Sequence, residues 1–433
     1  RWIDDNPPPA GNGWEPYVLS LRLVNLVKWC ARRRTVPEAW IASIAQQAQA
    51  LAVQEERHIL ANHLFANGKA LTFVGAFFDG DIGTRWLKRG LRILDREVEE
   101  QFLNDGGHFE LSPMYHSTLL WDLCDLVNLA GVSGVRQIED RSAAWRGVIA
   151  RGLVWLTGMS HPDGEIAFFN DCAFGIAPRL DQVRAYAEIL GCAVESLPTG
   201  LLSVAHLAES GYVVIGLEEG GKAILDVAEV GSSYQPGHAH ADTLSFELSL
   251  YGQRVLVNSG TSCYGTDAER QRQRATAAHS TVEVDGEDSS EVWAGFRVAR
   301  RARPGPVLIR RHSDSDGESL LVQCSHDGYR RLRGSPVHQR QWLFTPQSLC
   351  VTDTLKGRFG EAVSRFHLHP DVRLGENQEL LLAGGQQIRW SATGGQVRTV
   401  DSTWHPRFGE SVPNCCLEVR FVGNALTVEF HWN

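Results

Sequence analysis

The chain has 433 residues, of which 43% are hydrophobic and 21% charged, and its net charge is −9 at pH 7. This composition excludes a disordered protein and is sufficient for two or three domains. The negative charge argues against a nucleic-acid-binding protein, whose affinity rests on neutralising phosphates, and no apolar run reaches the roughly 18 residues of a membrane span. The expected partner is therefore a soluble molecule.

The first half of the sequence is predicted to be helical. After a stiff Pro- and Gly-rich linker at residues 6–13, helical periodicity occupies residues 15–34, 37–54, 56–78, 83–104, 113–131, 139–159 and 179–191. Near residues 191–200 the pattern changes to short alternating runs separated by glycine and polar turns, which continue to residue 433. A block of helices followed by a block of strands predicts the α+β class, with a helical domain at 1–195 and an antiparallel β-sandwich at 196–433.

Residues 234–294 contain the densest group of chemically reactive side chains. In an extended strand residues i and i+2 share a face, so His238 and His240 are predicted to point the same way. Residues 243–251 alternate polar and apolar side chains, and a Gly-Gln turn follows them, which predicts a β-hairpin. The histidines are either the centre of a site or hydrogen-bonded strand residues.

Beyond the predicted hairpin, Asn258 lies eighteen residues after His240, and a third strand is expected to bring in His279. Tyr264 and a run of alternating arginines lie between these two positions. Together these residues favour a site in this part of the chain.

Two stretches of the helical half also carry candidate chemistry. Asn62 and His63 interrupt an otherwise apolar helix, where asparagine lowers helix propensity and needs hydrogen-bond partners if buried. A structural role, in which Asn62 bonds to a neighbouring loop, is the alternative.

The second stretch is residues 107–116, where Ser112 before Pro113 is a typical helix start, with serine as the N-cap and proline at N1. Tyr115 and His116 are then expected in the first helical turn. Helix N-termini favour anions, so a tyrosinate is stabilised there.

Several of these motifs, taken in order, resemble a known family. The Asn62-His63 pair, the Glu-x-Ser-Pro-x-Tyr-His element at residues 110–116, and the later His-x-His-Ala-Asp and Ala-Ala-His-Ser elements look like the heparinase II/III-like polysaccharide lyases and their alginate-lyase relatives. The resemblance covers about residues 14–300. It implies an incomplete, N-terminally shortened (α/α) toroid followed by an antiparallel β-sandwich, with a polysaccharide cleft between them.

The resemblance also implies an activity, the cleavage of a uronic-acid-containing polysaccharide (glycosaminoglycan, alginate or bacterial exopolysaccharide) by β-elimination. The C5 proton of a uronate is weakly acidic, so the carboxylate must be neutralised and a base and an acid must flank C5 and O4. By resemblance Asn62 neutralises the carboxylate, helped by His63 or His238. Tyr115 is the acid and, where both protons lie on one face, also the base; otherwise His238 is the first choice of base. Tyr264 is the second tyrosine candidate.

The substrate-binding set is expected to include Glu110 and His116, which hold the loop, and the three arginines Arg270, Arg272 and Arg274. Guanidinium groups suit the planar recognition of carboxylates and sulfates.

A structural metal site is the one cofactor to consider, and no cofactor is required for the chemistry. His240, Asn258 and His279 fall where the family has two histidines and an aspartate. A neutral amide is a poorer zinc ligand than a carboxylate, so zinc is expected to bind weakly or not at all unless Asp242 substitutes.

Two other functions are considered. A non-catalytic polysaccharide-binding or assembly protein of exopolysaccharide production would share the fold. A glycoside hydrolase would need two carboxylates facing one cleft, for which Asp163, Glu165 and Asp171 are candidates. The chain begins at Arg1 without a signal peptide, as expected of a processed or trimmed product, and a periplasmic or secreted location is expected of a lyase.

Overall fold

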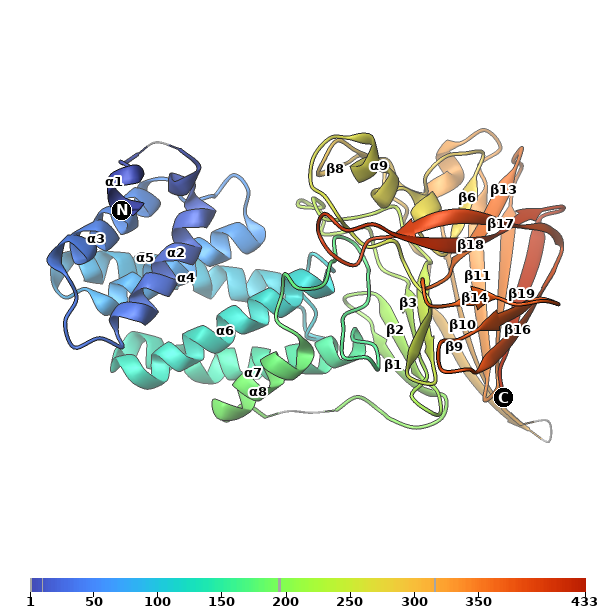
Figure 1. Ribbon diagram of the computed structural model, residues 1–433, viewed down its shortest axis with the longest axis horizontal. Helices are drawn as coiled ribbons and strands as arrows, with labels where there is room; N and C mark the ends of the chain where they lie inside the picture. The colour runs from blue at the N-terminus through green and yellow to red at the C-terminus, as the bar shows by residue number, and fades with distance from the viewer. Residues whose placement is uncertain (1, 10, 194–195, 315–316) are drawn as a thin grey trace. The chain divides into compact units, whose positions relative to one another are not determined.

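The computed structural model describes residues 2–9, 11–193, 196–314 and 317–433 (Figure 1). The Cα positions divide the chain into two compact units. The helical unit consists of Arg1–Leu103, Thr118–Ala150 and Ala185–Ala193, and the strand unit consists of Asn104–Ser117, Arg151–Arg184 and Val194–Asn433. Two segments of the mainly helical half, 104–117 and 151–184, therefore belong with the strands.

The seven predicted helical stretches correspond to helices α2 to α8. The described helices are α1 (Trp2–Asp5), α2 (Pro16–Cys30), α3 (Glu38–Val53), α4 (Ala61–Phe77), α5 (Gly80–Gln101), α6 (Pro113–Ser133), α7 (Arg136–Gly158), α8 (Leu180–Ile189) and α9 (Ala268–Arg274), with short 3₁₀ turns η1 (Asn12–Trp14), η2 (Thr276–Ala278) and η3 (Gly328–Arg331). The largest difference at a helix start is in α4, because residues 57–59 form a turn before it. Among the described helices, none has the length and apolarity needed to cross a bilayer.

Helix α4 is the centre of the helical unit, and 14 of its 17 residues are buried. It packs against α5 through small residues. A Cβ atom on Gly75 would lie 2.4 Å from the backbone nitrogen of Leu87, and one on Gly90 would lie 2.5 Å from Oγ1 of Thr72. Glycine is therefore required at both positions, since a side chain would force the two helices apart.

A buried ionic group also holds α4 in place. The Nζ atom of Lys69 lies 2.6 Å from Oδ1 of Asp122 and 2.6 Å from Oδ2 of Asp125. Burial alone would lower the pKa of Lys69, but the charges of the two carboxylates more than offset it, and the pKa is raised. Removing one member of such a group leaves an unpaired buried charge, which costs about 3–5 kcal/mol.

The strand unit has four described sheets, and all strand pairs within them are antiparallel. The first sheet has the order β1 (Ser203–Leu207), β2 (Tyr212–Gly216), β3 (Lys222–Asp226), β4 (Phe246–Leu250) and β5 (Gln253–Leu256). The second has the order β14 (Arg373–Leu374), β15 (Glu379–Leu381), β16 (Gln387–Thr393), β19 (Ala425–His431), β12 (Ser348–Lys356), β11 (Val337–Thr345), β10 (Gly317–His326) and β9 (Leu308–Asp314). The third has the order β17 (Gly395–Trp404), β18 (Val412–Phe421), β13 (Ala362–His367) and β6 (Val282–Val284), and β7 (Val292–Trp293) pairs with β8 (Arg297–Val298).

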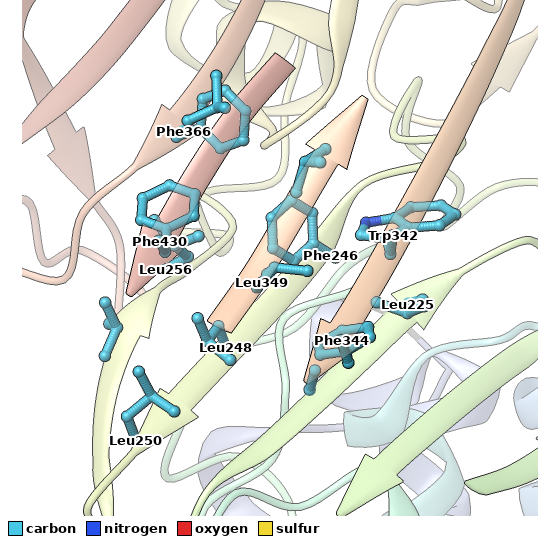
Figure 2. Close-up of a cluster of buried hydrophobic side chains, with 14 of the residues drawn as sticks. Leu225, Phe246, Leu248, Leu250, Leu256, Trp342, Phe344, Leu349, Phe366 and Phe430 are labelled. Carbon is cyan, nitrogen blue, oxygen red and sulfur yellow. The ribbon is translucent and has the colours of Figure 1, made fainter. Parts of the chain in front are cut away.

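The core of the strand unit lies between these sheets. Strands β10 and β11 bury every second residue over most of their length, as expected when one face of a sheet packs inward. Figure 2 shows Phe246 of β4 beside Trp342 of β11, in a cluster that also includes Phe366 and Phe430. The rings of Phe246 and Trp342 meet edge to face with centroids 6.3 Å apart. The helical first part and the antiparallel sheets agree with the predicted α+β class.

The predicted hairpin is confirmed by the pairing of β4 with β5, but the two histidines before it are not on a strand. His238 and His240 lie in a loop that precedes β4. His279 likewise follows the 3₁₀ turn η2 and precedes β6, so the prediction of a strand at each of these positions was wrong. The alternation of residue types is the same in this loop as in a strand, so the pattern does not distinguish the two. The hydrogen-bond partners that hold the loop come from distant parts of the chain.

Candidate active site

A buried carboxylate organises the candidate site in the strand unit. Oδ2 of Asp171 lies 2.9 Å from Nδ1 of His238, and Oδ1 lies 2.9 Å from Nε2 of His240. Arg270 donates to both oxygens of Asp171, at 2.8 Å for the Nη2–Oδ2 bond. Burial by itself would raise the pKa of Asp171, but the charge of Arg270 and the hydrogen bonds from both histidines hold it well below its usual range. Asp171 is therefore ionised and accepts a hydrogen bond from each imidazole.

This arrangement selects the tautomer of His238. Because Nδ1 of His238 donates to an ionised carboxylate, Nε2 of the neutral ring carries the lone pair. The side chain of His238 is 13% exposed, and Oε1 of Glu110 is 3.8 Å from Nε2. His238 therefore has the chemistry of a general base held in one orientation.

Tyr115 lies directly against this base. Its ring stacks on the His238 ring with centroids 4.0 Å apart and an interplanar angle of 30°. The Oγ atom of Ser112 accepts from the Tyr115 backbone N–H at 3.3 Å, so the predicted N-cap is present at the start of α6. The tyrosine is thus in the first turn of a long helix, where the backbone dipole favours a negative charge.

The hydroxyl of Tyr264 is 2.9 Å from that of Tyr115. The pKa of Tyr264 is raised by burial, by the charge of Asp171 and by Tyr115 itself. A tyrosine that keeps its proton donates a hydrogen bond, so Tyr264 can stabilise Tyr115 when Tyr115 loses its proton. The Tyr264 ring also packs edge to face on Phe296, with centroids 5.1 Å apart. Phe296, which had not been singled out in the sequence, is half-exposed beside both Tyr264 and His238.

Backbone strain is concentrated next to these residues. Leu111 (φ 59°) and Asn170 (φ 60°) have positive φ although neither is glycine, and they precede Ser112 and Asp171. Nδ2 of Asn170 donates to the carbonyl of Leu111 at 2.9 Å, which ties the two strained turns together. Such conformations cost on the order of 1–3 kcal/mol each and are retained where surrounding contacts impose them, often at active sites.

The structure corrects the predicted roles of two arginines. Arg270 and Arg274 lie on α9, and both are fully buried. Arg270 binds Asp171, and Arg274 donates to the carbonyls of Ala239 and Ala294, among others. Neither guanidinium faces solvent, so both position the site and do not bind substrate directly.

Arg272, the third arginine of the predicted set, is exposed. It pairs with Glu269 and hydrogen-bonds to His405. His116 is buried, with Nε2 2.9 Å from the carbonyl of Gly152, and burial lowers its pKa to about 4. His116 therefore holds its loop as a neutral ring.

The trio considered as a metal site is wholly buried and arranged as hydrogen-bond partners. Nδ1 of His240 is 3.3 Å from Nε2 of His279. The Asn258 amide donates to Oγ of Ser245 at 3.3 Å and accepts from the backbone N–H of Ser280 at 3.4 Å.

Nδ1 of His240 therefore faces the other imidazole, and both polar atoms of the Asn258 amide have hydrogen-bond partners. Weak or absent zinc binding stays a prediction. Asp242 accepts from the backbone N–H of Asn170 at 3.3 Å, and burial raises its pKa. In the described parts of the chain, no three His, Cys, Asp or Glu side chains form a group that could hold a metal.

Asn62 and His63 belong to the helical unit. Asn62 is 6% exposed, and its side chain makes no hydrogen bond to any other described residue, so the bond to a neighbouring loop that was the alternative role is not present. Leu60 (φ 65°) and Ala61 (φ 51°) precede it in strained conformations. His63 is bound through Nδ1 to Oε1 of Glu56 at 2.8 Å. An unpartnered amide after a strained turn is the pattern of a functional residue.

The carboxylates proposed for a hydrolase do not form an acid and base pair. Asp163 accepts from the Arg254 guanidinium at 2.7 Å, Glu165 is paired with Arg179, and Asp171 is enclosed by its three cationic or imidazole partners. Asp171 had been considered only for that role. The signal in the sequence is its position two residues after the apolar run at 166–169, where a buried segment ends in polar residues.

The fold agrees with the comparisons to known proteins. Residues 199–433 match the family model described as "Heparinase II/III-like, C-terminal", and residues 20–190 match "Heparinase II/III N-terminus". The chain belongs to the heparinase II/III-like family.

Two curated relatives are similar in sequence. One is a heparin-sulfate lyase of Bacteroides stercoris, 27% identical over 340 residues that cover 73% of this chain and 47% of the relative. The other is FtsZ-localized protein C of Caulobacter vibrioides, 25% identical over 428 residues that cover 90% of this chain and 69% of the relative. The chain thus spans about half the length of the first relative.

Solved structures show the same fold. A crystal structure of heparinase III superposes with a TM-score of 0.79 at 17% identity, covering 100% of this chain and 72% of that chain. A heparan sulfate lyase from Pedobacter heparinus gives 0.69 at 18% identity, covering 99% and 70%. The predicted α+β fold, a helical toroid-type part followed by antiparallel sheets, is confirmed.

Proposed function

We propose that this protein is a polysaccharide lyase that cleaves a uronic-acid-containing acidic polysaccharide by β-elimination. The observation that carries the proposal is the stacking of Tyr115 on His238, with Tyr115 also hydrogen-bonded to Tyr264 at 2.9 Å. An acid beside a base matches a reaction in which one proton is removed from C5 and another is delivered to O4, because both atoms are bonded to C4.

The chemistry assigns a role to each residue. The Nε2 lone pair of His238 takes the C5 proton, the electron pair forms the C4=C5 double bond, and the C4–O4 bond breaks. The Tyr115 hydroxyl gives its proton to the leaving O4. Where both protons are on one face of the sugar, Tyr115 as phenolate takes the C5 proton and returns it to O4. Tyr264 donates a hydrogen bond to the Tyr115 oxygen in either case.

Neutralisation of the substrate carboxylate stays a prediction for Asn62. Its amide, unpartnered among the described residues, is suited to donate to a carboxylate oxygen as charge develops in the intermediate. The relatives named as heparin-sulfate lyases support a sulfated glycosaminoglycan as the first polymer to test. Alginate and bacterial exopolysaccharides are the alternatives, and a periplasmic or secreted location is proposed for such an enzyme.

Incubation with a panel of uronate polymers tests the proposal, with ultraviolet absorbance reporting the unsaturated uronate product. We expect absorbance with at least one polymer and none in Tyr115→Phe. Tyr251→Phe is the matched control, because Tyr251 is in the same unit and its hydroxyl bonds to the Asn433 carbonyl. No absorbance with any polymer would contradict the proposal.

A second candidate is a non-catalytic protein of an assembly. It is favoured by the similarity to FtsZ-localized protein C over 90% of this chain. The same panel separates the two, because a non-catalytic protein would give no unsaturated product with any polymer. In that case, co-localisation with FtsZ in cells becomes the measurement to make.

A further inference from the structure

A groove of about 510 Å³ lies in the strand unit, built partly from the segment that leads into His238. Its charged lining consists of Arg300, Arg301, Arg303 and Arg331 with two acids, Glu229 and Asp327. The whole chain has a net charge of −9, so a surface with twice as many arginines as acids is a local reversal of sign. Such a groove attracts anions.

Two of these arginines are held in place by backbone carbonyls. Arg301 donates to the backbone carbonyls of Val230, Ser232 and Ser233 at 3.3, 2.6 and 3.0 Å. Arg331 donates to the carbonyls of Gly328 and Asp288, both at 2.5 Å. A carbonyl orders a guanidinium but carries no net charge, so both guanidinium groups are oriented in advance of any ligand. Arg331 also lies 3.8 Å from Glu287 and 4.0 Å from Glu291, whereas Arg301 forms no ion pair within 4.0 Å among the described residues. Pre-ordering lowers the entropy cost of binding.

The guanidinium of Arg303 supplies N–H donors that are available to a ligand. Its backbone N–H binds Oδ1 of Asp327 at 2.8 Å, while its exposed guanidinium makes no hydrogen bond or ion pair with a described residue. Arg300 differs, because Glu291 binds it through two hydrogen bonds at 2.7 and 2.5 Å. An unpaired guanidinium beside two ordered ones suits two-pronged binding of a carboxylate or sulfate.

The groove is continuous in sequence with the candidate active site. Phe296, whose ring centroid is 5.8 Å from that of His238, precedes Arg303 by seven residues. A chain of seven residues spans at most about 25 Å, which limits the separation of these two Cα atoms. Arg301 in turn fastens the segment 230–233 that continues to His238. Two segments, 229–238 and 296–303, therefore contribute to both the groove and the site.

We propose that this groove binds a sulfate or carboxylate group of an acidic polysaccharide, on a sugar other than the one that reacts. The identity of the polymer rests on the proposed function, while the anion site rests on the arginines. An anionic chain is then held at two places, and affinity rises with chain length once the chain reaches both.

Titration calorimetry with heparan sulfate fragments of graded length tests this site, in the Tyr115→Phe background so that no cleavage occurs. We expect Arg303→Gln to weaken binding of long fragments roughly 3- to 10-fold and to flatten the rise of affinity with length, as for loss of one exposed charged contact. Arg303→Lys should recover part of the loss. Arg310→Gln is the matched control, since Arg310 is an exposed arginine of β9 outside the groove, and it should leave the length dependence unchanged.

Three results would overturn the groove proposal. They are no binding of heparan sulfate by the parent protein, an unchanged length dependence in Arg303→Gln, or an equal loss in Arg310→Gln. Failure of the lyase proposal is seen separately, as binding that depends on Arg303 without any unsaturated product from the wild-type protein. Cleavage by the wild-type protein with no effect of Arg303 would reject only the groove.

Discussion

The carboxylate of Asp171 and the imidazole of His238 are joined by a 2.9 Å hydrogen bond between residues 67 positions apart in the chain. The same carboxylate binds Arg270, so its charge is kept in a fully buried position. One ionised group therefore orients the proposed base and fixes which of its nitrogens carries the lone pair.

Replacing Asp171 with Asn should damage both folding and activity. The change leaves the buried Arg270 without its counter-charge, which costs about 3–5 kcal/mol of unfolding free energy. It also removes the acceptor that keeps the proton on Nδ1 of His238, so kcat should fall even in the folded fraction. Urea unfolding and kcat corrected for folded protein measure the two effects. Glu291→Gln is the control, because its partly exposed pair with Arg300 should contribute at most about 1 kcal/mol. An Asp171→Asn protein with wild-type stability and kcat would refute this role.

Tyr115 and Tyr264 should differ in the size of their effects. Tyr115→Phe removes the transferable proton, so kcat should fall by roughly 10²- to 10⁴-fold while polymer binding is kept. Tyr264→Phe removes only a hydrogen-bond donor to Tyr115, so a smaller loss is expected, with a shift of the pH profile toward higher pH because the Tyr115 phenolate is less stabilised. Initial rates across a pH series measure this. Equal losses in both variants would show that Tyr264 transfers the proton itself.

Asn62 and Asn67 provide a matched pair on helix α4. Asn67 is buried, with Nδ2 3.0 Å from Oγ of Ser20 and 3.0 Å from Oε2 of Glu56. Asn67→Ala should therefore lower stability by about 1–3 kcal/mol, because its partners are left unsatisfied. Asn62→Ala should leave stability nearly unchanged but lower kcat more than it raises KM, because a bond that strengthens in the transition state acts on kcat. Loss of affinity without loss of kcat would make Asn62 a plain binding residue.

The chemistry of the buried trio of His240, Asn258 and His279 predicts the zinc content of the protein. Two imidazoles and an amide lack the negative charge of the usual ligand set, so protein purified without added metal should contain little or no zinc. Asn258→Asp should create zinc affinity by restoring that charge. Elemental analysis of both proteins measures the content. Stoichiometric zinc in the wild-type protein, lost in His279→Ala, would show that the amide suffices.

Acid should destabilise the strand unit through its buried neutral histidines. Burial lowers the pKa of His161 and of His367 to about 4, with Arg254 and Arg365 adding to the effect. The unfolded chain, with a histidine pKa of about 6.5, binds the protons first as pH falls. The contribution of each histidine to the free energy of unfolding is therefore complete above about pH 6.5 and is lost toward pH 4. For each histidine, the free energy of unfolding changes by at most about 1.4 kcal/mol per pH unit.

Urea unfolding between pH 7 and pH 4 measures that slope. His161→Gln should reduce it, and the exposed His58→Gln should not. A slope that is the same in the wild-type and His161→Gln proteins would mean that His161 is already protonated in the folded state.

Features that depend on neighbours in the sequence could be predicted well. Helical patterns located α2 to α8, because helix-forming residues and helical spacing are properties of each segment by itself. The Gly-Gln turn gave the β4–β5 hairpin, and Ser112 before Pro113 gave the start of α6. Each of these signals is local, and each was confirmed.

The tertiary structure alone decided which polar groups meet. Strands β1 to β3 lie between Asp171 and the two histidines in the sequence. No spacing rule predicts that Asp171 binds His238 and His240. The same carboxylate draws Arg270 into the interior, where an arginine run by itself suggests an exposed, substrate-facing surface. The physical reason is that periodicity follows from the geometry of one segment, whereas a buried charge is stable only where a distant partner neutralises it.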